Sequence, residues 1–190
     1  MGLFLTTRGA GALQSRLARA TQSALTYSNV GATLDGVTPS DFHAVSRERV
    51  LGVGPAAFTK AREGLRQWRA HRGAGLLLIP NDASVRVGEN VVVLIPFGRL
   101  AVAAPCRVTV VIDEPRRFAC AYGTLTGHPE SGEELFDVTL GDDDAVTFAI
   151  RAFSKPASLL TRVGSPAARM IQAMVTTRYL DALEHYVRSS

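Results

Sequence analysis

The feature of this sequence that most constrains its fold is a long run of short apolar segments between residues 76 and 154. Clusters of Gly, Pro, Asn and Asp separate the segments, and these residues are typical of turns. Short connections predict antiparallel pairing, because a parallel crossover needs a much longer connection. We therefore expect a sheet whose strands in this region are 76–79, 84–87, 90–97, 100–112, 117–125, 133–140 and 145–154.

The last of these segments indicates how the sheet is buried. Its apolar residues Val146, Phe148 and Ile150 alternate with Thr147 and Arg151. Such alternation places one face of a strand on the core and leaves the other face more polar. The sequence therefore predicts a sheet with a single main core on one side.

A helix is predicted for residues 55–71, directly after a further strand expected over residues 41–53. Within it Phe58, Leu65 and Trp68 fall on one stripe with a period of 3.6 residues. Arginines and a lysine occupy the other faces, so the helix from 55 to 72 is strongly basic.

The chain ends in a longer helix, predicted for residues 166–187. Ser165 is a favourable N-cap, and Pro166 suits the first helical position. About 22 residues at 1.5 Å per residue give a length of roughly 33 Å. The broad apolar face of this helix, which includes Met170 and Met174, must cover something extended, and the sheet is the element of that size.

This order of elements predicts an α+β fold in which a curved antiparallel sheet grips the C-terminal helix. The order resembles that of the START-type and polyketide-cyclase helix-grip superfamily, and the resemblance implies a cavity between the sheet and the helix. Met170 and Met174 would line that cavity or simply fill the core, since methionine adapts to irregular spaces. We expect a single domain over residues 1–190, in which residues 1–26 are a loosely attached N-terminal helix or a targeting peptide.

Several sequence motifs are more informative about the family of this chain than its composition is. They are Tyr-Ser-Asn-Val-Gly-Ala-Thr at 27–33, Gly-Val-Gly at 52–54, Ala-Tyr-Gly-Thr-Leu-Thr-Gly-His-Pro-Glu-Ser-Gly-Glu-Glu at 121–134 and Ala-Phe-Ser-Lys-Pro-Ala at 152–157. Together they resemble a family of conserved bacterial and plant proteins that is described as a domain of unknown function. The resemblance covers the chain from Tyr27 to the last helix, and it implies one domain but no mechanism.

The third motif concentrates titratable side chains and forms the candidate site. His128 and Glu130 are its candidates for catalysis, because a histidine beside carboxylates suits proton transfer. Successive residues of a strand point to opposite faces, so only one of Glu133 and Glu134 can enter the core, on the side to which Tyr122 points.

Ligand contacts are predicted for Tyr122, Glu133, Glu134, Arg107, Arg151, Met170 and Met174. In this interpretation Arg107 or Arg151 pairs with the glutamate that turns inward, and the pair holds a polar head group. The alternative is that the hairpin around His128 is a structural turn whose carboxylates accept backbone N–H bonds.

Three functions fit these observations. The first is the binding of an apolar small molecule in a cavity beneath the last helix. The second is a cyclase- or hydrolase-like enzyme that uses His128, Glu130, Glu133 or Glu134. The third is a module that binds a protein or an anionic surface through the basic helix 55–72, which requires its arginines to form one uninterrupted patch.

Composition indicates the cellular compartment of the protein and limits its possible cofactors and partners. Cys106 and Cys120 lie in apolar runs without metal-ligand spacing, which favours buried thiols, a reducing cytoplasmic compartment and no cofactor or metal. The chain has no apolar run of about 20 residues, so no membrane span is expected. The net charge of +4 gives no clear indication of nucleic-acid binding, and nothing in the sequence specifies an oligomeric state.

Overall fold

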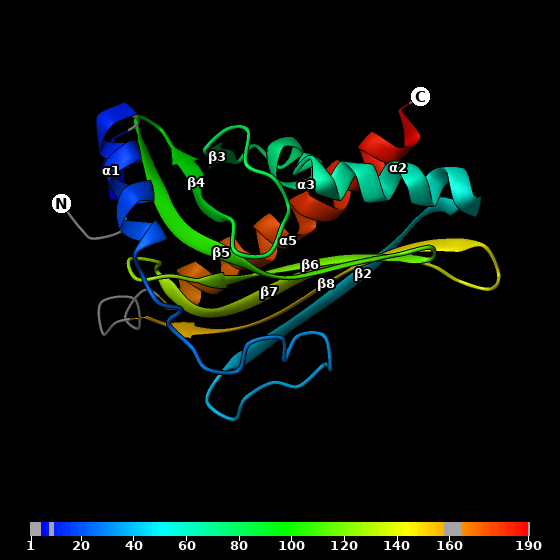
Figure 1. The fold of residues 1–190 in the computed structure, drawn as a ribbon, viewed down its shortest axis with the longest axis horizontal. Helices are drawn as coiled ribbons and strands as arrows, with labels where there is room; N and C mark the ends of the chain where they lie inside the picture. The colour runs from blue at the N-terminus through cyan, green and yellow to red at the C-terminus, as the bar shows by residue number, and fades with distance from the viewer. Residues whose placement is uncertain (1–4, 8–9, 158–164, 190) are drawn as a thin grey trace.

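An antiparallel sheet forms the body of the protein (Figure 1). The computed structural model describes residues 5–7, 10–157 and 165–189. Its strands are β1 (Leu5–Thr7), β2 (His43–Val53), β3 (Leu77–Ile79), β4 (Asn90–Phe97), β5 (Leu100–Glu114), β6 (Arg117–Thr124), β7 (Glu130–Leu140) and β8 (Ala145–Pro156). The strand order is β2-β8-β7-β6-β5-β4-β3, and β1 pairs with β5. Register shifts at Val50/Gly52 and Val108/Val110 interrupt β2 and β5, as bulges that bend a sheet do.

Four helices accompany the sheet in the described residues: α1 (Ala10–Thr21), α2 (Gly54–Arg66), α3 (Arg69–Gly73) and α5 (Ser165–Arg188). Figure 1 shows α5 running along the sheet with α2 and α3 packed against it, and α5 contacts β2 and β8 as well. Two glycines permit the close approach, because a Cβ on Gly64 would lie 2.7 Å from Leu183 and one on Gly73 would lie 2.7 Å from Ala182. The predicted α+β helix-grip fold is confirmed.

The two faces of the sheet bury different sets of residues: the main core lies on one side, as the alternation predicted, but the other side buries a smaller apolar cluster as well. Phe118, Cys120 and Tyr122 of β6 belong to the main core, which lies between the sheet and α5. Ala119 and Ala121 belong to a smaller cluster on the opposite face. We call these the inner and outer faces. Both predicted thiols, Cys106 and Cys120, are buried on the inner face and free.

The helix expected over residues 55–71 is interrupted at Trp68. Trp68 adopts a left-handed backbone conformation, with φ of 58°, between α2 and α3. Its indole Nε1 donates a 3.0 Å hydrogen bond to the carbonyl oxygen of Ala83, and both residues are buried. A contact with a loop 15 positions away therefore accompanies the break, and a helical periodicity cannot contain that information. The strand expected at 84–87 is also absent, and these residues form a loop.

The apolar side of α5 is narrower than the sequence suggested. Among the α5 side chains that the structure describes, the buried ones are Val175, Thr176, Tyr179, Leu180, Leu183 and Val187. Met170 and Met174 lie on the exposed side, with 70% and 43% of their surfaces accessible. The expectation that these methionines lie on the face that the sheet grips is therefore wrong.

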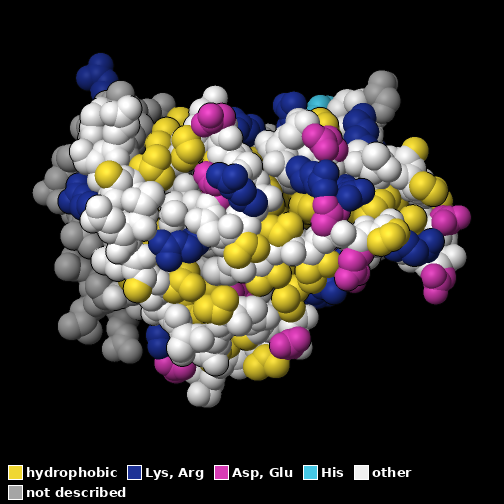
Figure 2. Space-filling model, in the orientation of Figure 1, with side chains coloured by type: hydrophobic (Ala, Val, Ile, Leu, Met, Phe, Trp, Pro, Cys, Tyr) yellow, Lys and Arg dark blue, Asp and Glu magenta, His cyan; other side chains and the backbone are white. Residues whose placement is uncertain are grey.

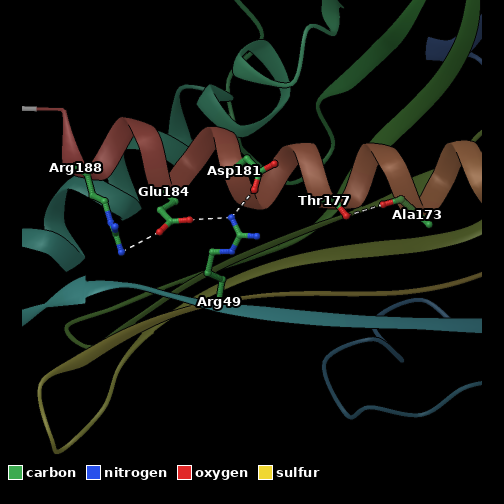
Figure 3. Close-up of polar contacts among 6 residues, drawn as sticks. All are labelled: Arg49, Ala173, Thr177, Asp181, Glu184 and Arg188. Atoms are coloured by element: carbon green, nitrogen blue, oxygen red, sulfur yellow. Dashed lines mark hydrogen bonds and ion pairs between the residues drawn. The ribbon is translucent and has the colours of Figure 1, made fainter.

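An ion-pair cluster on the edge strand fastens α5 to the sheet. Arg49 of β2 contacts Asp181 at 2.5 Å and Glu184 at 2.8 Å, and Arg188 contacts Glu184 at 2.9 Å (Figure 3). Thr177 donates its hydroxyl hydrogen to the carbonyl oxygen of Ala173 within the helix. Because these charges are partly exposed, each pair adds only about 0–1 kcal/mol, and the two pairs of Arg49 are the ones that join α5 to β2.

Candidate functional site

The neighbouring residues Glu133 and Glu134 of β7 point to opposite faces of the sheet, as their spacing predicted. Glu133 is on the outer face and is only 3% exposed. It accepts hydrogen bonds from the Tyr27 hydroxyl at 2.7 Å, the Gly31 amide at 2.9 Å and the Thr33 hydroxyl at 2.6 Å. The carboxylate of Glu133 thus fastens the Tyr-Ser-Asn-Val-Gly-Ala-Thr motif to the sheet.

Glu134 is on the inner face and has a very different environment. Its Oε2 accepts a 2.5 Å hydrogen bond from the hydroxyl of Tyr122, its direct partner on β6. The Tyr122 oxygen lies 3.2 Å from Nε2 of His71 in α3. We call His71, Tyr122 and Glu134 the inner polar triad.

Aromatic rings surround the triad. The centroid of the His71 ring lies 4.8 Å from that of Trp68, 4.9 Å from Phe136 and 4.6 Å from Tyr179. Tyr122 and His71 are 7% and 3% exposed, whereas Glu134 is partly exposed. The triad is therefore a group of polar side chains inside an apolar core. Its Glu134 end is accessible to solvent.

Burial changes the charges that these groups carry. It raises the pKa of Glu134 to about 7, against the lowering effect of the Tyr122 hydrogen bond, and Glu130 raises it further. Burial lowers the pKa of His71 to about 3, with a further contribution from Arg72. The pKa of Tyr122 is raised, also mainly by burial. At neutral pH the imidazole and the phenol are uncharged, and Glu134 is the group that titrates.

Two polar atoms of the triad have no hydrogen-bond partner among the described residues. Nδ1 of His71 is buried and unpaired. Glu134 has Tyr122 as its one hydrogen-bond partner in the described part of the chain, through Oε2, which leaves Oε1 unpaired. No ion pair of the described residues includes Glu134. Nδ1 of His71 thus leaves hydrogen-bonding capacity unused inside the core, where such capacity is costly, whereas Oε1 of the partly exposed Glu134 is open to a partner from outside the core.

His128 and Glu130 lie in the connection from β6 to β7 and the start of β7. Nδ1 of His128 is 2.9 Å from the amide nitrogen of Glu130 and 2.8 Å from its carbonyl oxygen. Burial lowers the pKa of His128 to about 4 and raises that of Glu130, against the lowering effect of Ser154. These contacts hold the turn, which favours the structural interpretation of the hairpin.

Neither arginine pairs with the inward glutamate. Arg107 donates to the side chain of Asn90 at 2.9 Å and to the carbonyl oxygen of Ser23 at 3.0 Å, next to the end of α1. Arg151 contacts Asp137 at 3.3 Å on the outer face, where Arg117 also binds Asp137. The predicted pairing of Arg107 or Arg151 with an inward glutamate is wrong, because both side chains find partners elsewhere.

The basic residues of 55–72 do not form an uninterrupted patch. Arg62 and Arg66 both pair with Asp113, and Arg72 donates to the Asn81 side chain at 2.7 Å. Arg69 lies over the ring of Tyr186, 5.3 Å from its centroid. On the face shown in Figure 2, Lys and Arg side chains are interspersed with Asp and Glu. The requirement for the anionic-surface hypothesis is therefore not met.

A surface groove of about 410 Å³ lies between α3 and α5. Its lining residues are Gly73, Ala74, Gly75, Arg178, Asp181, Ala182 and His185. It is lined neither by the inner polar triad nor by the methionines, so it is not the cavity that the fold resemblance implies.

Among the described residues, no helix combines the length and the apolar character that a membrane span requires.

His71 is the residue of the triad that the sequence analysis missed. It follows Trp68 by three positions, so it continues the apolar stripe of the preceding helix. A histidine at such a position was a usable indication that an imidazole enters the core. The sequence did place Tyr122 and one of the two glutamates on the inner face.

The fold is shared with solved structures of low sequence identity. A hypothetical protein of Helicobacter pylori is similar with a TM-score of 0.58 and 13% identity, covering 87% of this chain and 96% of that chain. A norcoclaurine synthase point mutant of Thalictrum flavum, in complex with a transition-state analogue, has a TM-score of 0.52 and 13% identity. That match covers 80% of this chain and 97% of the synthase.

Sequence comparison gives stronger matches. A UPF0548 protein of Deinococcus radiodurans is 33% identical over 184 residues, which cover 90% of this chain and 88% of that protein. A UPF0548 protein of Arabidopsis thaliana is 28% identical, covering 82% of this chain and 79% of the relative. The family model described as "Domain of unknown function (DUF1990)" matches residues 26–182. As the motifs at 27–33 and 121–134 predicted, the chain belongs to this conserved family of uncharacterised proteins, DUF1990.

Proposed function

We propose that the protein binds a small molecule with an apolar body between the inner face of the sheet and α5, at the inner polar triad. The observation that carries the proposal is the unpaired Oε1 of Glu134, a partly exposed carboxylate oxygen next to an aromatic core. Small-molecule sites are mostly apolar and contain a few polar groups that fix the orientation of the ligand. Glu134, Tyr122 and His71 have this character.

The contrast with Glu133 supports this interpretation. Glu133 has its charge compensated by hydrogen bonds from Tyr27, Gly31 and Thr33, so its role is structural. Glu134 receives one hydrogen bond, and its raised pKa reflects the energetic cost of that environment. A carboxyl group that lowers stability without fastening a part of the fold is typical of a functional site.

The fold gives independent support, at the level of architecture only. The norcoclaurine synthase structure is described as a complex with a transition-state analogue, so one protein of this fold binds a small molecule. The START-like resemblance of the element order points the same way.

The test is whether an apolar molecule binds at this place. Native mass spectrometry and organic extraction of the purified protein would detect a ligand that copurifies, and Nile red, a neutral dye that fluoresces in apolar sites, would report an accessible one. We expect Ala152→Leu to weaken dye binding, because Ala152 is the register partner of Glu134 on the inner face. Ala149→Leu is the matched control, since Ala149 is equally buried at 7% exposure but points to the outer face.

Two results would count against the proposal. One is a protein that is repeatedly empty on extraction and produces no increase in Nile red fluorescence. The other is equal dye binding by the wild type, Ala152→Leu and Ala149→Leu, provided that circular dichroism shows both variants to be folded.

A further inference from the structure

The proposed function leaves open which chemical group the ligand presents to the triad. The hydrogen-bond directions narrow the choice. The Tyr122 hydroxyl uses its one hydrogen in the bond to Glu134. The contact between His71 and Tyr122 then requires His71 to donate from Nε2, because the Tyr122 oxygen is left as an acceptor.

This assignment fixes the character of the two unpaired atoms. A neutral imidazole protonated at Nε2 has a lone pair at Nδ1, so Nδ1 of His71 is an acceptor. Oε1 of an ionised Glu134 is also an acceptor. The hydroxyl of Tyr179, which lies close to Tyr122, has one hydrogen to donate, but no hydrogen bond of the described residues joins it to Nδ1 of His71 or to Oε1 of Glu134. The triad therefore lacks a donor partner, and a ligand group that only accepts hydrogen bonds does not complement it.

The charges around Glu134 further restrict which polar group the ligand can present to the triad. Tyr122 and His71 are neutral, and the other charged group that affects Glu134 is a second carboxyl, that of Glu130. Ser154, which neighbours Glu130, and Gln172, which lies 3.3 Å from Ser154, are uncharged. The potential at Glu134 is thus negative, with no arginine or lysine of the described residues paired to it. A carboxylate or phosphate group would be repelled, whereas a cation would be attracted.

We infer that the ligand is an apolar molecule with a protonated amine, and that the ammonium group donates a hydrogen bond to Oε1 of Glu134. This inference rests on the proposed function, because it assigns the polar group of the same ligand. An ammonium group supplies both the missing donor and the missing positive charge. Charge-assisted hydrogen bonds of this kind are about twice as strong as neutral ones.

The experiment compares three probes with the same apolar body: octylamine, octanol and octanoate. Each probe is titrated against Nile red bound to the wild-type protein, and displacement of the dye is measured. The pH is 8, where Glu134 is mainly ionised and octylamine is protonated. We expect octylamine to bind about tenfold more tightly than octanol, the ratio that corresponds to about 1.4 kcal/mol. Octanoate should bind more weakly than octanol.

A substitution at the carboxyl tests the contact itself. Glu134→Gln removes the charge but keeps the shape, so it should abolish the preference for octylamine and leave octanol binding unchanged. Glu48→Gln removes a carboxylate from the exposed strand β2 and should leave the preference intact. The ranking of the three probes on the wild type decides the question even if a variant is poorly folded.

The outcomes separate this inference from the function on which it rests. If octanol displaces the dye and octylamine is no better, a small-molecule site exists and the amine inference is overturned. If octanoate binds most tightly, the inference is overturned as well. If Nile red and all three probes fail to bind, the proposed function itself fails.

Discussion

The hydroxyl of Tyr27 donates a 2.7 Å hydrogen bond to Glu133, across 106 positions of the sequence. The ring of Tyr27 also lies over Gly123, where a Cβ atom would come within 2.2 Å of the phenolic oxygen. Two of the family motifs, at 27–33 and 121–134, are therefore parts of one structural unit on the outer face. This relationship is separate from the inner polar triad, although Glu133 and Glu134 are adjacent in sequence.

Gly123→Ala should destabilise the protein, because the added methyl group displaces Tyr27 from its bond to Glu133. Overpacking of this kind costs about 1–3 kcal/mol, which urea unfolding would measure. Gly11→Ala is the matched control: no atom lies within 4 Å of its Cβ position in α1. Alanine there should stabilise by roughly 0.5–1 kcal/mol, because glycine is a poor helix former. Equal effects of the two variants would contradict the packing described.

Glu133→Gln should also be destabilising, by about 2–3 kcal/mol, the usual contribution of hydrogen bonds to a buried charged group. A glutamine turns an amide donor toward the donors of Tyr27, Gly31 or Thr33, so at least one hydrogen bond is lost. Chemical denaturation at pH 7 would measure the loss. A variant as stable as the wild type would mean that the carboxylate of Glu133 does not hold the motif in place.

Glu134→Gln should have the opposite sign. The pKa of Glu134 is raised from 4.5 to about 7, so the folded state binds more protons than the unfolded state between these values. The stability that the protonated carboxyl provides is fully present below pH 4.5 and is lost as pH rises through 7. At pH 8 the glutamine variant should be more stable by about 1–2 kcal/mol, allowing for solvent screening of a partly exposed group.

The measurement for Glu134→Gln is the free energy of unfolding at pH 5 and at pH 8. The difference between variant and wild type should grow with pH. A difference that is the same at both values would show that Glu134 titrates as it does in the unfolded chain.

The alternation of strand residues was enough to separate Glu133 from Glu134 and to place Tyr122 on the inner face, because a period of two is a property of the strand itself. The long helix and its place on the sheet followed from length and apolar periodicity. These features depend on local geometry, which a sequence contains directly.

The features that were missed depend on tertiary contacts. His71 reaches the triad through a break at Trp68, whose indole binds the carbonyl oxygen of Ala83. Arg107 and Arg151 were assigned to the wrong partners because the sequence does not reveal that Asn90 and Asp137 lie closer. Local sequence propensity does not indicate which of several distant residues a side chain will contact.

His71 should remain uncharged in mildly acidic solution. Its pKa is lowered from 6.5 to about 3, so the neutral form is the one that the fold favours. The corresponding stability is present above pH 6.5 and is lost as pH falls toward 3. Long-range ¹H–¹⁵N NMR at pH 8 should show the proton on Nε2, the tautomer that the bond from Tyr122 to Glu134 requires. A proton on Nδ1 instead would reverse the hydrogen-bond directions of the triad.

The orientation of α5 can be tested by two truncations on opposite sides of the helix. Leu183 is fully buried and would contact any Cβ placed on Gly64, whereas Met174 is 43% exposed. Leu183→Ala should therefore cost about 2–5 kcal/mol, the usual range for a buried leucine. Met174→Ala should change the free energy of unfolding by no more than about 0.5 kcal/mol, as exposed substitutions do. If the apolar face predicted from sequence were the buried one, the two variants would be similarly damaging, so thermal or urea unfolding of this pair distinguishes the two orientations of the helix.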